Sequence, residues 1–174
     1  MIKMTQEAIN NGKVLLSLNC SREHVEDLQK ILDCTDLLKK ILTSPVVSNK
    51  KKYNIIDKIM KKTKLPKCLI SFLKVMCKNG MIDQMDDILE SYYRQWDLQH
   101  DILRVRAAFA EDPSEKEKKE VYSYIEGKFP GWKCVCQFEV EPELLGGFKL
   151  RYGNIEYDRS ILNRLQYLEN IISS

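Results

Sequence analysis

Residues 140–161 read VEPELLGGFKLRYGNIEYDRSI, and this stretch decides how the C-terminal part of the chain folds. Its apolar side chains alternate with charged ones, which is the pattern of half-buried strands. The alternating residues are Phe148, Leu150 and Tyr152, followed by Ile155 and Tyr157. Between them, Gly153-Asn154 suits a two-residue hairpin turn of type II′. Gly146-Gly147 precedes the first strand and permits a tight bend or a close backbone approach.

The same alternation occurs twice upstream of this hairpin, with a helix between the two strands. The inward-facing residues are Leu103, Val105, Ala107 and Phe109 in one strand and Cys134, Cys136, Phe138 and Val140 in the other. Ser114 and Glu117 have the spacing of a capping box, so we expect the helix to begin there. A last helix would place Ile161, Leu165, Leu168 and Ile172 on one face. Residues 100–174 therefore predict a small α/β domain with the order strand-helix-strand-strand-strand-helix.

The N-terminal 99 residues show helical periodicity almost throughout. Boundary residues divide them into six segments: Ser21 and Ser48 as N-caps, Pro66 in a first turn, and Ser44-Pro45 and Asn79-Gly80 as stops. The first segment is the weakest because Asn10-Asn11-Gly12 places three poor helix formers in it. We therefore expect an α plus α/β fold, with a six-helix bundle over 1–99 and the small α/β domain over 100–174.

Composition excludes several classes of protein. The chain has 174 residues, 28 basic and 25 acidic, with a net charge of +3. This balance does not suit a nucleic-acid binder, which needs a concentrated basic face. A lysine-rich run from Lys50 to Lys64 is best explained as the solvated face of a helix. No stretch has the length and apolarity of a membrane span, and the N-terminus lacks secretory-signal features. We therefore expect no direct membrane insertion.

The six cysteines do not form a recognisable metal or disulfide pattern. They are Cys20, Cys34, Cys68, Cys77, Cys134 and Cys136, without a Cys-x-x-Cys pair. Zinc would need additional ligands, and the two histidines, His24 and His100, lie in distant segments. The favoured interpretation is that the cysteines are reduced and pack as small apolar side chains in the core.

No catalytic or cofactor-binding constellation is evident either. The two histidines offer no local nucleophile–base pair, and Asp86-Asp87 lies on the polar side of a predicted helix. Gly146-Gly147 leads into a strand, whereas a phosphate-binding loop leads into a helix N-terminus. We expect no catalytic residue, no bound metal and no cofactor.

The stretch quoted above resembles the C-terminal signature of the delta subunit of F-type ATP synthases, the oligomycin sensitivity conferral protein of mitochondria. The residues that carry this resemblance are Pro142, Leu145, Gly146, Gly147, Gly153, Asp158 and Ser160. Two upstream segments are also similar to the family: residues 42–48, around Ser44-Pro45, and Phe72-Leu73 through Asn79-Gly80 to Met81.

The resemblance implies a non-catalytic stator subunit, held peripherally at the cytoplasmic face of the cell membrane as part of the complex. It implies two partners: the N-terminal helix of an alpha subunit for the helical domain, and the C-terminus of the stalk b subunit for the α/β domain. We expect the first contact to involve Leu15, Leu69, Phe72, Leu73 and Met76, because apolar residues at this spacing suit helix-in-groove recognition. The same stripe also suits the core of a bundle.

Three alternatives remain open on the sequence alone: an unrelated helical adaptor, a nucleic-acid binder and a small enzyme. A helical adaptor with an unrelated partner would not bind an N-terminal peptide of an alpha subunit. A nucleic-acid binder would show salt-sensitive binding to DNA or RNA, and a small enzyme would lose turnover when His24, His100 or a cysteine is replaced.

Overall fold

The computed structural model describes residues 4–34, 36–60, 63, 65–153, 155–161 and 163. The chain divides into two compact units, Met1–Trp96 and Asp97–Ser174. The division falls within the last turn of a helix, slightly before the predicted boundary at residue 99.

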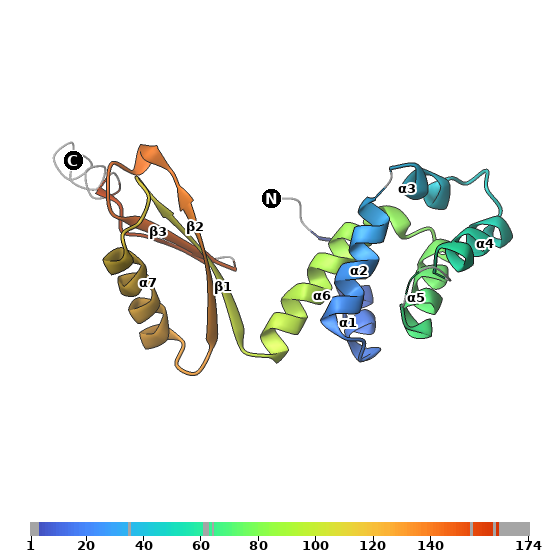
Figure 1. Cartoon of the computed structure of the whole chain (residues 1–174), viewed down its shortest axis with the longest axis horizontal. Helices are drawn as coiled ribbons and strands as arrows, with labels where there is room; N and C mark the ends of the chain where they lie inside the picture. The colour runs from blue at the N-terminus through green and yellow to red at the C-terminus, as the bar shows by residue number, and fades with distance from the viewer. Residues whose placement is uncertain are drawn as a thin grey trace. The chain divides into compact units, whose positions relative to one another are not determined.

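The first unit is helical. Its elements are α1 (Gln6–Ser17), α2 (Arg22–Asp33), α3 (Asp36–Thr43), α4 (Asn49–Met60), α5 (Lys67–Lys78), the short 3₁₀ helix η1 (Ile82–Gln84) and α6 (Met85–Gln99), shown in Figure 1. The predicted stop at Asn79-Gly80 is confirmed. Gly80 has a φ of +70°, and the amide of Met81 returns to the carbonyl of Met76 at 2.9 Å. This left-handed ending lets the chain turn directly into η1 and α6.

The first helix is continuous through Gly12, although its sequence places three poor helix formers there. Helix α1 runs from Gln6 to Ser17 and is capped by the hydroxyl of Thr5, which accepts a hydrogen bond from the amide of Ala8 at 3.1 Å. Gly12 is buried against α6. A Cβ atom there would lie 2.5 Å from the Oγ of Ser91. The absence of a side chain at Gly12 thus allows α6 to approach closely, and α1 and α6 lie side by side (Figure 1).

One apolar core joins the helices of the first unit. Its most deeply buried large side chains are Leu15, Leu28, Leu42, Ile56, Leu69, Leu73, Ile82, Met85, Ile88, Leu89 and Tyr92. They come from α1 to α6, so each helix contributes its apolar stripe to the same interior. Burying side chains of this size contributes about 1.5–3 kcal/mol each to folding.

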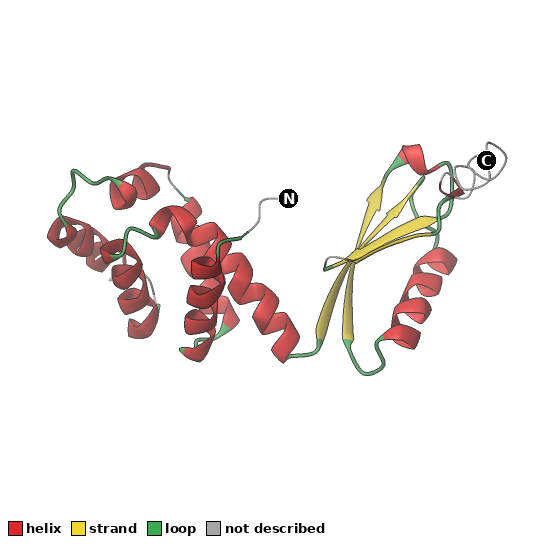
Figure 2. Ribbon diagram, turned by 180° about the vertical axis from the view of Figure 1, so that it is seen from behind, coloured by secondary structure: helices red, strands yellow, loops and turns green. Residues whose placement is uncertain are grey.

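The second unit contains a four-stranded sheet with the order β2-β1-β3-β4. The strands are β1 (Ile102–Phe109), β2 (Lys133–Val140), β3 (Phe148–Tyr152) and β4 (Ile155–Asp158). β1 and β2 are parallel and joined by α7 (Glu115–Lys128), whereas β3 pairs antiparallel with both β1 and β4. The strands and α7 appear in yellow and red in Figure 2. The predicted order of strands and of the helix between them is therefore confirmed.

Helix α7 begins at the predicted capping box. The hydroxyl of Ser114 accepts the amide of Glu117, and the Glu117 carboxylate accepts the amide of Ser114 at 2.8 Å. Its buried residues Val121 and Ile125 pack on one face of the sheet. That face presents Val105, Ala107, Phe109, Phe148, Leu150 and Tyr152 to the helix. The predicted inward-facing residues Val105, Ala107 and Phe109 are buried there, and Leu103, Cys134, Cys136 and Phe138 are partly buried against the same core. The prediction is wrong for Val140, which ends β2 and is 47% exposed.

Within the described ranges the chain is thus a mixed α/β protein with seven α-helices and a four-stranded sheet. The predicted last helix starts at Ile161, but Leu165, Leu168 and Ile172 lie outside the described residues, as does Asn154 of the hairpin turn. Over this part of the chain, no helix has the length and apolar character required to span a membrane.

Candidate docking surfaces

The five residues expected to bind a partner are all in the core of the first unit. Leu15, Leu69 and Leu73 are at most 1% exposed, Met76 is 2% and Phe72 is 5% exposed. In the isolated chain these five side chains therefore offer almost no surface, and their part in binding a partner stays a prediction. The physical reason is that core packing and helix docking require the same apolar spacing, and the neighbouring helices already cover this stripe.

The solvent-facing sides of the same two helices carry different apolar residues. On α5, Val75 is 48% exposed, and on α1, Val14 is 50% exposed. Charged and polar residues flank each of them, with Ser71 and Lys78 exposed on α5 and Lys13 on α1. Single exposed apolar side chains are ordinary on protein surfaces. Val14 and Val75 differ from other exposed apolar side chains in that each lies on a helix whose opposite side is packed in the core.

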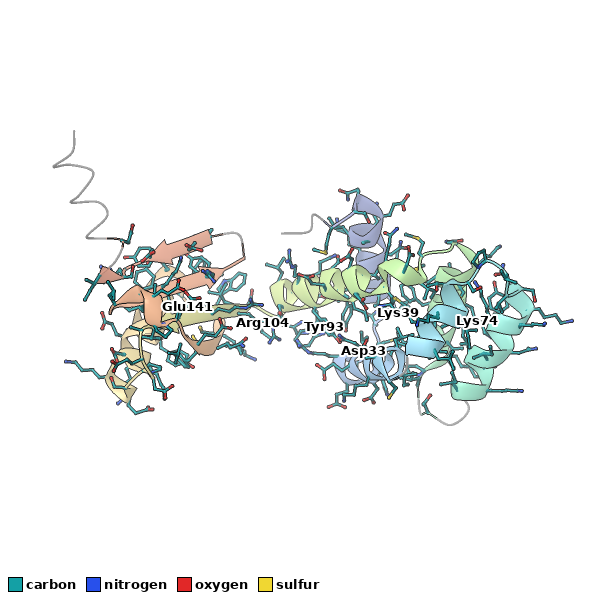
Figure 3. All side chains as sticks on the ribbon, turned by 90° about the horizontal axis from the view of Figure 1, so that it is seen from above. Asp33, Lys39, Lys74, Tyr93, Arg104 and Glu141 are labelled. Atoms are coloured by element: carbon teal, nitrogen blue, oxygen red, sulfur yellow. The ribbon has the colours of Figure 1, made fainter. Side chains whose placement is uncertain are left out.

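Ion pairs tie the helices of the first unit together at their edges (Figure 3). The Lys74 ammonium of α5 lies 2.6 Å from a carboxylate oxygen of Asp57 in α4, and it also lies 6.0 Å from the ring centre of Tyr53. Lys39 of α3 reaches Asp86 at the start of α6, at 2.5 Å. Such partly exposed pairs contribute at most about 1 kcal/mol each, so they add only modestly to the core contacts between these helices.

A mixed aromatic and charged cluster joins α2 to α6. The guanidinium of Arg22 lies over the rings of Tyr93 and Trp96, at 5.2 and 4.8 Å from their centres. The Tyr93 hydroxyl donates to Gln29 at 2.9 Å. Burial, followed by the nearby Glu26 carboxylate, raises the pKa of Tyr93 to about 12. The phenol therefore stays neutral and able to donate, and the cluster holds α2 against α6 at physiological pH.

The family-like motif of the second unit forms a compact bend. Leu145, Gly146 and Gly147 have successive φ values of +57°, +134° and +77°, which glycine adopts without strain and which other residues adopt at a cost. The Gly146 carbonyl accepts the amide of Ile161 at 3.0 Å. A Cβ atom on Gly147 would lie 2.4 Å from the carbonyl oxygen of Arg159. The bend therefore packs directly on the segment that leads into the last helix.

The other motif residues shape that same segment. The Asp158 carboxylate accepts the amide of Ser160 at 2.8 Å. The Ser160 hydroxyl accepts the amide of Asn163 at 3.1 Å, as an N-cap does. Pro142 opens the short 3₁₀ helix η2 (Pro142–Leu144), and Gly153 has a φ of +58° in the hairpin turn. The motif residues thus serve the architecture of the second unit.

The sheet face away from α7 is rich in charge. Arg104, Arg106, Lys149 and Arg151 lie on it together with Glu156 and Asp158. Arg151 bonds Glu156 at 3.0 Å and lies 3.4 Å from Glu141 (Figure 3), and Lys149 lies 2.8 Å from Glu156. The bond from Lys149 is the first cause that lowers the pKa of Glu156, so the network stays ionised at neutral pH.

Arg106 differs from the other cations of this face in its neighbours across the strands. It is exposed, and its partners in the register are Gln137 on β2 and Arg151 on β3. Over the part of the chain that the structure describes, no carboxylate lies within ion-pair distance of it. Sequence alternation placed Arg104 and Arg106 on the outer face, but only the strand order β2-β1-β3-β4 brings Arg106 beside Arg151.

The cysteines occupy several environments. Cys77 is buried, as expected, whereas Cys34 is exposed, so the expectation of core packing is wrong for Cys34. The remaining four are partly buried and form two close pairs. The Sγ atoms of Cys20 and Cys68 are 2.7 Å apart, and those of Cys134 and Cys136 are 3.2 Å apart.

The geometry shows no constellation suited to acid–base or metal chemistry among the residues that are described. No three histidine, cysteine or acidic side chains gather there as metal ligands do. The ring of His24 is hydrogen-bonded through Nδ1 to the hydroxyl of Ser21 at 2.7 Å, which occupies it at the start of α2.

Comparison with known proteins gives a consistent result. The family described as ATP synthase delta (OSCP) subunit matches residues 13–172, which reach across both units. The ATP synthase subunit delta of Rickettsia typhi is 25% identical over 152 residues, covering 87% of this chain and 82% of its own. That of Pelagibacter ubique is 23% identical, covering 88% and 83%. A chain in the cryo-EM structure of the Toxoplasma gondii mitochondrial ATP synthase hexamer superposes on this chain with a TM-score of 0.68 at 13% identity. The superposition covers 98% of this chain and 99% of that one, which shows a shared fold.

Proposed function

The chain belongs to the ATP synthase delta (OSCP) subunit family, and from this premise we propose that it links the catalytic head of the enzyme to the end of the peripheral stalk through one docking surface on each unit. As a member of this family it is a non-catalytic, peripheral-stalk subunit of ATP synthase. The observation that carries the proposal is the family match over residues 13–172, which includes helices of the first unit and all four strands of the second.

We assign the head contact to the first unit, acting as a six-helix bundle. Its occupant would be the N-terminal helix of an alpha subunit, lying on the exposed sides of α1 and α5 with Val14 and Val75 as apolar anchors. Leu15, Leu69, Phe72, Leu73 and Met76 would support these helices from the core. Pre-organisation of this kind reduces the entropic cost of binding, which favours the slow dissociation that a stator contact requires.

The head contact is tested by calorimetry with an N-terminal peptide of the alpha subunit. Val75→Asp places a charge at the proposed contact and should weaken binding by tenfold or more, because losing a central anchor costs about 2 kcal/mol or more. Val46→Asp is the matched control, since Val46 is 91% exposed and lies in the α3–α4 connection. Equal affinities of the two variants, both folded by circular dichroism, would contradict the placement.

We assign the stalk contact to the charged sheet face of the second unit. The C-terminus of the b subunit would lie across Arg104, Arg106 and Arg151, with a carboxylate pairing with Arg106. Arg106→Glu should lower affinity for a C-terminal fragment of the b protein and weaken the salt dependence of binding, because it replaces one attractive contact by repulsion. Lys116→Glu is the matched control, because it makes the same charge change on exposed α7. An unchanged affinity of Arg106→Glu would contradict this assignment.

Both proposed contacts would hold the protein peripherally on the complex, and we propose that this is at the cytoplasmic face of the cell membrane. The alternative of an unrelated helical adaptor is not favoured, because the family match extends over both units. The two binding experiments also separate these possibilities, since an unrelated adaptor would bind neither the alpha peptide nor the stalk fragment.

A further inference from the structure

Two cysteines far apart in the sequence meet at one edge of the first unit. Cys20 lies in the turn between α1 and α2, and Cys68 lies in the first turn of α5. Forty-eight positions separate them, yet their Sγ atoms are 2.7 Å apart. A covalent disulfide has an S–S distance of about 2.05 Å, so only a small adjustment of the two side chains separates the thiols from a bond.

The surroundings of this pair are largely apolar. Cys20 and Cys68 pack against the core beside the partly buried Leu18 and Ile70. The hydroxyl of Tyr92 is buried without a hydrogen-bond partner among the described residues, and Cys20 is close enough to influence the Tyr92 phenol. Burial, then the Cys68 thiol, raises the pKa of Cys20 to about 12. A thiolate is therefore disfavoured at Cys20, whereas a neutral disulfide would carry no charge to desolvate.

We propose that Cys20 and Cys68 form a reversible disulfide bond that joins the α1–α2 turn to α5. The bond forms by exchange with a small-molecule disulfide. One cysteine sulfur attacks it to give a mixed disulfide and releases one small thiol, and the second cysteine sulfur then displaces the other. The two protein thiols lose two electrons and two protons in total, and both small thiols leave reduced.

The second close pair provides an internal comparison. Cys134 and Cys136 are two residues apart on β2. Alternate Cα atoms of a strand are about 6.6 Å apart, near the upper end of the ~4.4–6.8 Å range that disulfides span. A bridge there would have to distort a strand that is hydrogen-bonded to β1. Cys20 and Cys68 lie at helix ends, where the backbone can adjust more easily.

The bond would cross-link a large part of the first unit. The closed loop contains α2, α3 and α4, and cross-linking a loop of this length restricts the unfolded chain strongly. The bond would also fix the start of α5 relative to the end of α1, the two helices assigned above to the head contact. The proposal itself does not depend on that assignment, because its test requires only the isolated full-length chain.

The test is equilibration of the full chain with oxidised and reduced glutathione. We expect two protein thiols to be lost without bound glutathione, and a peptide map that joins Cys20 to Cys68. The unfolding midpoint of the helical signal should rise by about 10 °C or more, given the loop length and the size of the unit. Because the Cys20 thiol has a raised pKa, we expect the reaction to be slow.

Two variants provide controls. Cys34→Ser removes an exposed cysteine and should retain both the bridge and the rise in midpoint. Cys20→Ser should abolish both, and its midpoint under reducing conditions shows whether the variant folds. A map that contains only glutathione adducts, or a Cys134–Cys136 bridge without the Cys20–Cys68 bridge, would overturn the proposal. So would an oxidised wild-type midpoint equal to the reduced one.

Discussion

Adding a single methyl group at Gly147 tests whether the bend before β3 is a close-packed joint. In Gly147→Ala the new Cβ would lie 2.4 Å from the carbonyl oxygen of Arg159 and 3.1 Å from the Cα of Ser160. Both are backbone atoms, so neither can rotate away. The bend would have to open and weaken two hydrogen bonds that close it: Arg159 amide to Phe148 carbonyl at 2.9 Å, and Ile161 amide to Gly146 carbonyl at 3.0 Å.

The expected cost has two parts. Gly147 has a φ of +77°, and holding a residue with a Cβ in this region costs about 1–2 kcal/mol. Forcing an additional methyl group into a close-packed site costs about a further 1–3 kcal/mol. The sum of about 2–5 kcal/mol is a large fraction of the stability of a domain this small. For a domain of under 100 residues, it corresponds to a midpoint lowered by roughly 10 °C or more.

Gly131 separates these two parts. Its φ of +86° is similar, but a Cβ atom there has nothing within 4 Å. Gly131→Ala should therefore cost only the backbone part, about 1–2 kcal/mol. The assay is urea unfolding followed by the fluorescence of Trp132 in a Trp96→Phe background, which reports the second unit. Equal midpoints of Gly147→Ala and Gly131→Ala would refute the idea that the bend packs on Arg159.

Four other substitutions probe the packing of α1, with a control in α7, the core of the first unit and the cap of α7. Gly12→Ala should destabilise the first unit in thermal unfolding, because the new Cβ would lie 2.5 Å from Ser91 Oγ, although alanine is the better helix former. Gly127→Ala is the control: no described atom lies within 4 Å of a Cβ there, so it should stabilise α7 by up to about 1 kcal/mol. Phe72→Ala should cost about 3–5 kcal/mol in urea unfolding, as core truncations do, and a near-neutral result would contradict its burial. Hydrogen bonds from Ser114 lower the pKa of Glu117 below the ordinary pKa of a glutamate. The ionised Glu117 side chain therefore stabilises the fold at any pH above the ordinary pKa, and this stabilisation is lost as the pH falls through the lowered pKa. The stability difference between wild type and Glu117→Gln should therefore shrink on acidification, and a difference that stays constant down to low pH would be evidence against the capping role.

The second unit was predictable because its local signals agree. Period-2 alternation assigned the inner and outer faces of the strands, and Ser114 with Glu117 marked the start of α7. Glycines at positive φ marked the bend and the hairpin turn. None of these local signals predicts the order of the strands in the sheet. The neighbouring positions of Arg106 and Arg151 therefore required the structure, because β1 lies between β2 and β3 in the sheet but not in the sequence.

The first helix shows how a local signal can mislead. Asn10-Asn11-Gly12 lowers helix propensity, but propensity amounts to only about 1 kcal/mol at a glycine, which tertiary packing can exceed. The hydroxyl of Ser91 and the side chain of Gln95 both reach the carbonyl oxygen of Ile9, each at 3.4 Å. These long contacts, together with the apolar contacts around Leu15, hold α1 on α6. The absence of a side chain at Gly12 permits this approach, so the weakest helix former is the residue that packing requires.

The Cys20–Cys68 pair was hidden for a related reason. Motif spacing detects only ligands and thiols that are near one another in sequence, whereas these two meet because α2, α3 and α4 return the chain to its starting point. The general argument that reduced cysteines pack as small apolar groups was adequate for Cys77. The same argument could not distinguish a single buried cysteine such as Cys77 from two cysteines in contact, because the distance between two sulfur atoms depends on the tertiary structure.

The same limit applies to the five residues predicted to bind a partner. An apolar stripe at helical spacing indicates that one side of α5 is buried, but it does not indicate whether the chain's own core or a partner protein buries it. Within the isolated chain the cover is its own core, since Phe72 and Met76 are almost inaccessible. A partner helix must then bind what the core leaves exposed, and on α5 this is a single valine among polar residues. Affinity for the head would therefore depend on how firmly the core residues of α5 hold that side in place, more than on the apolar area that α5 itself presents.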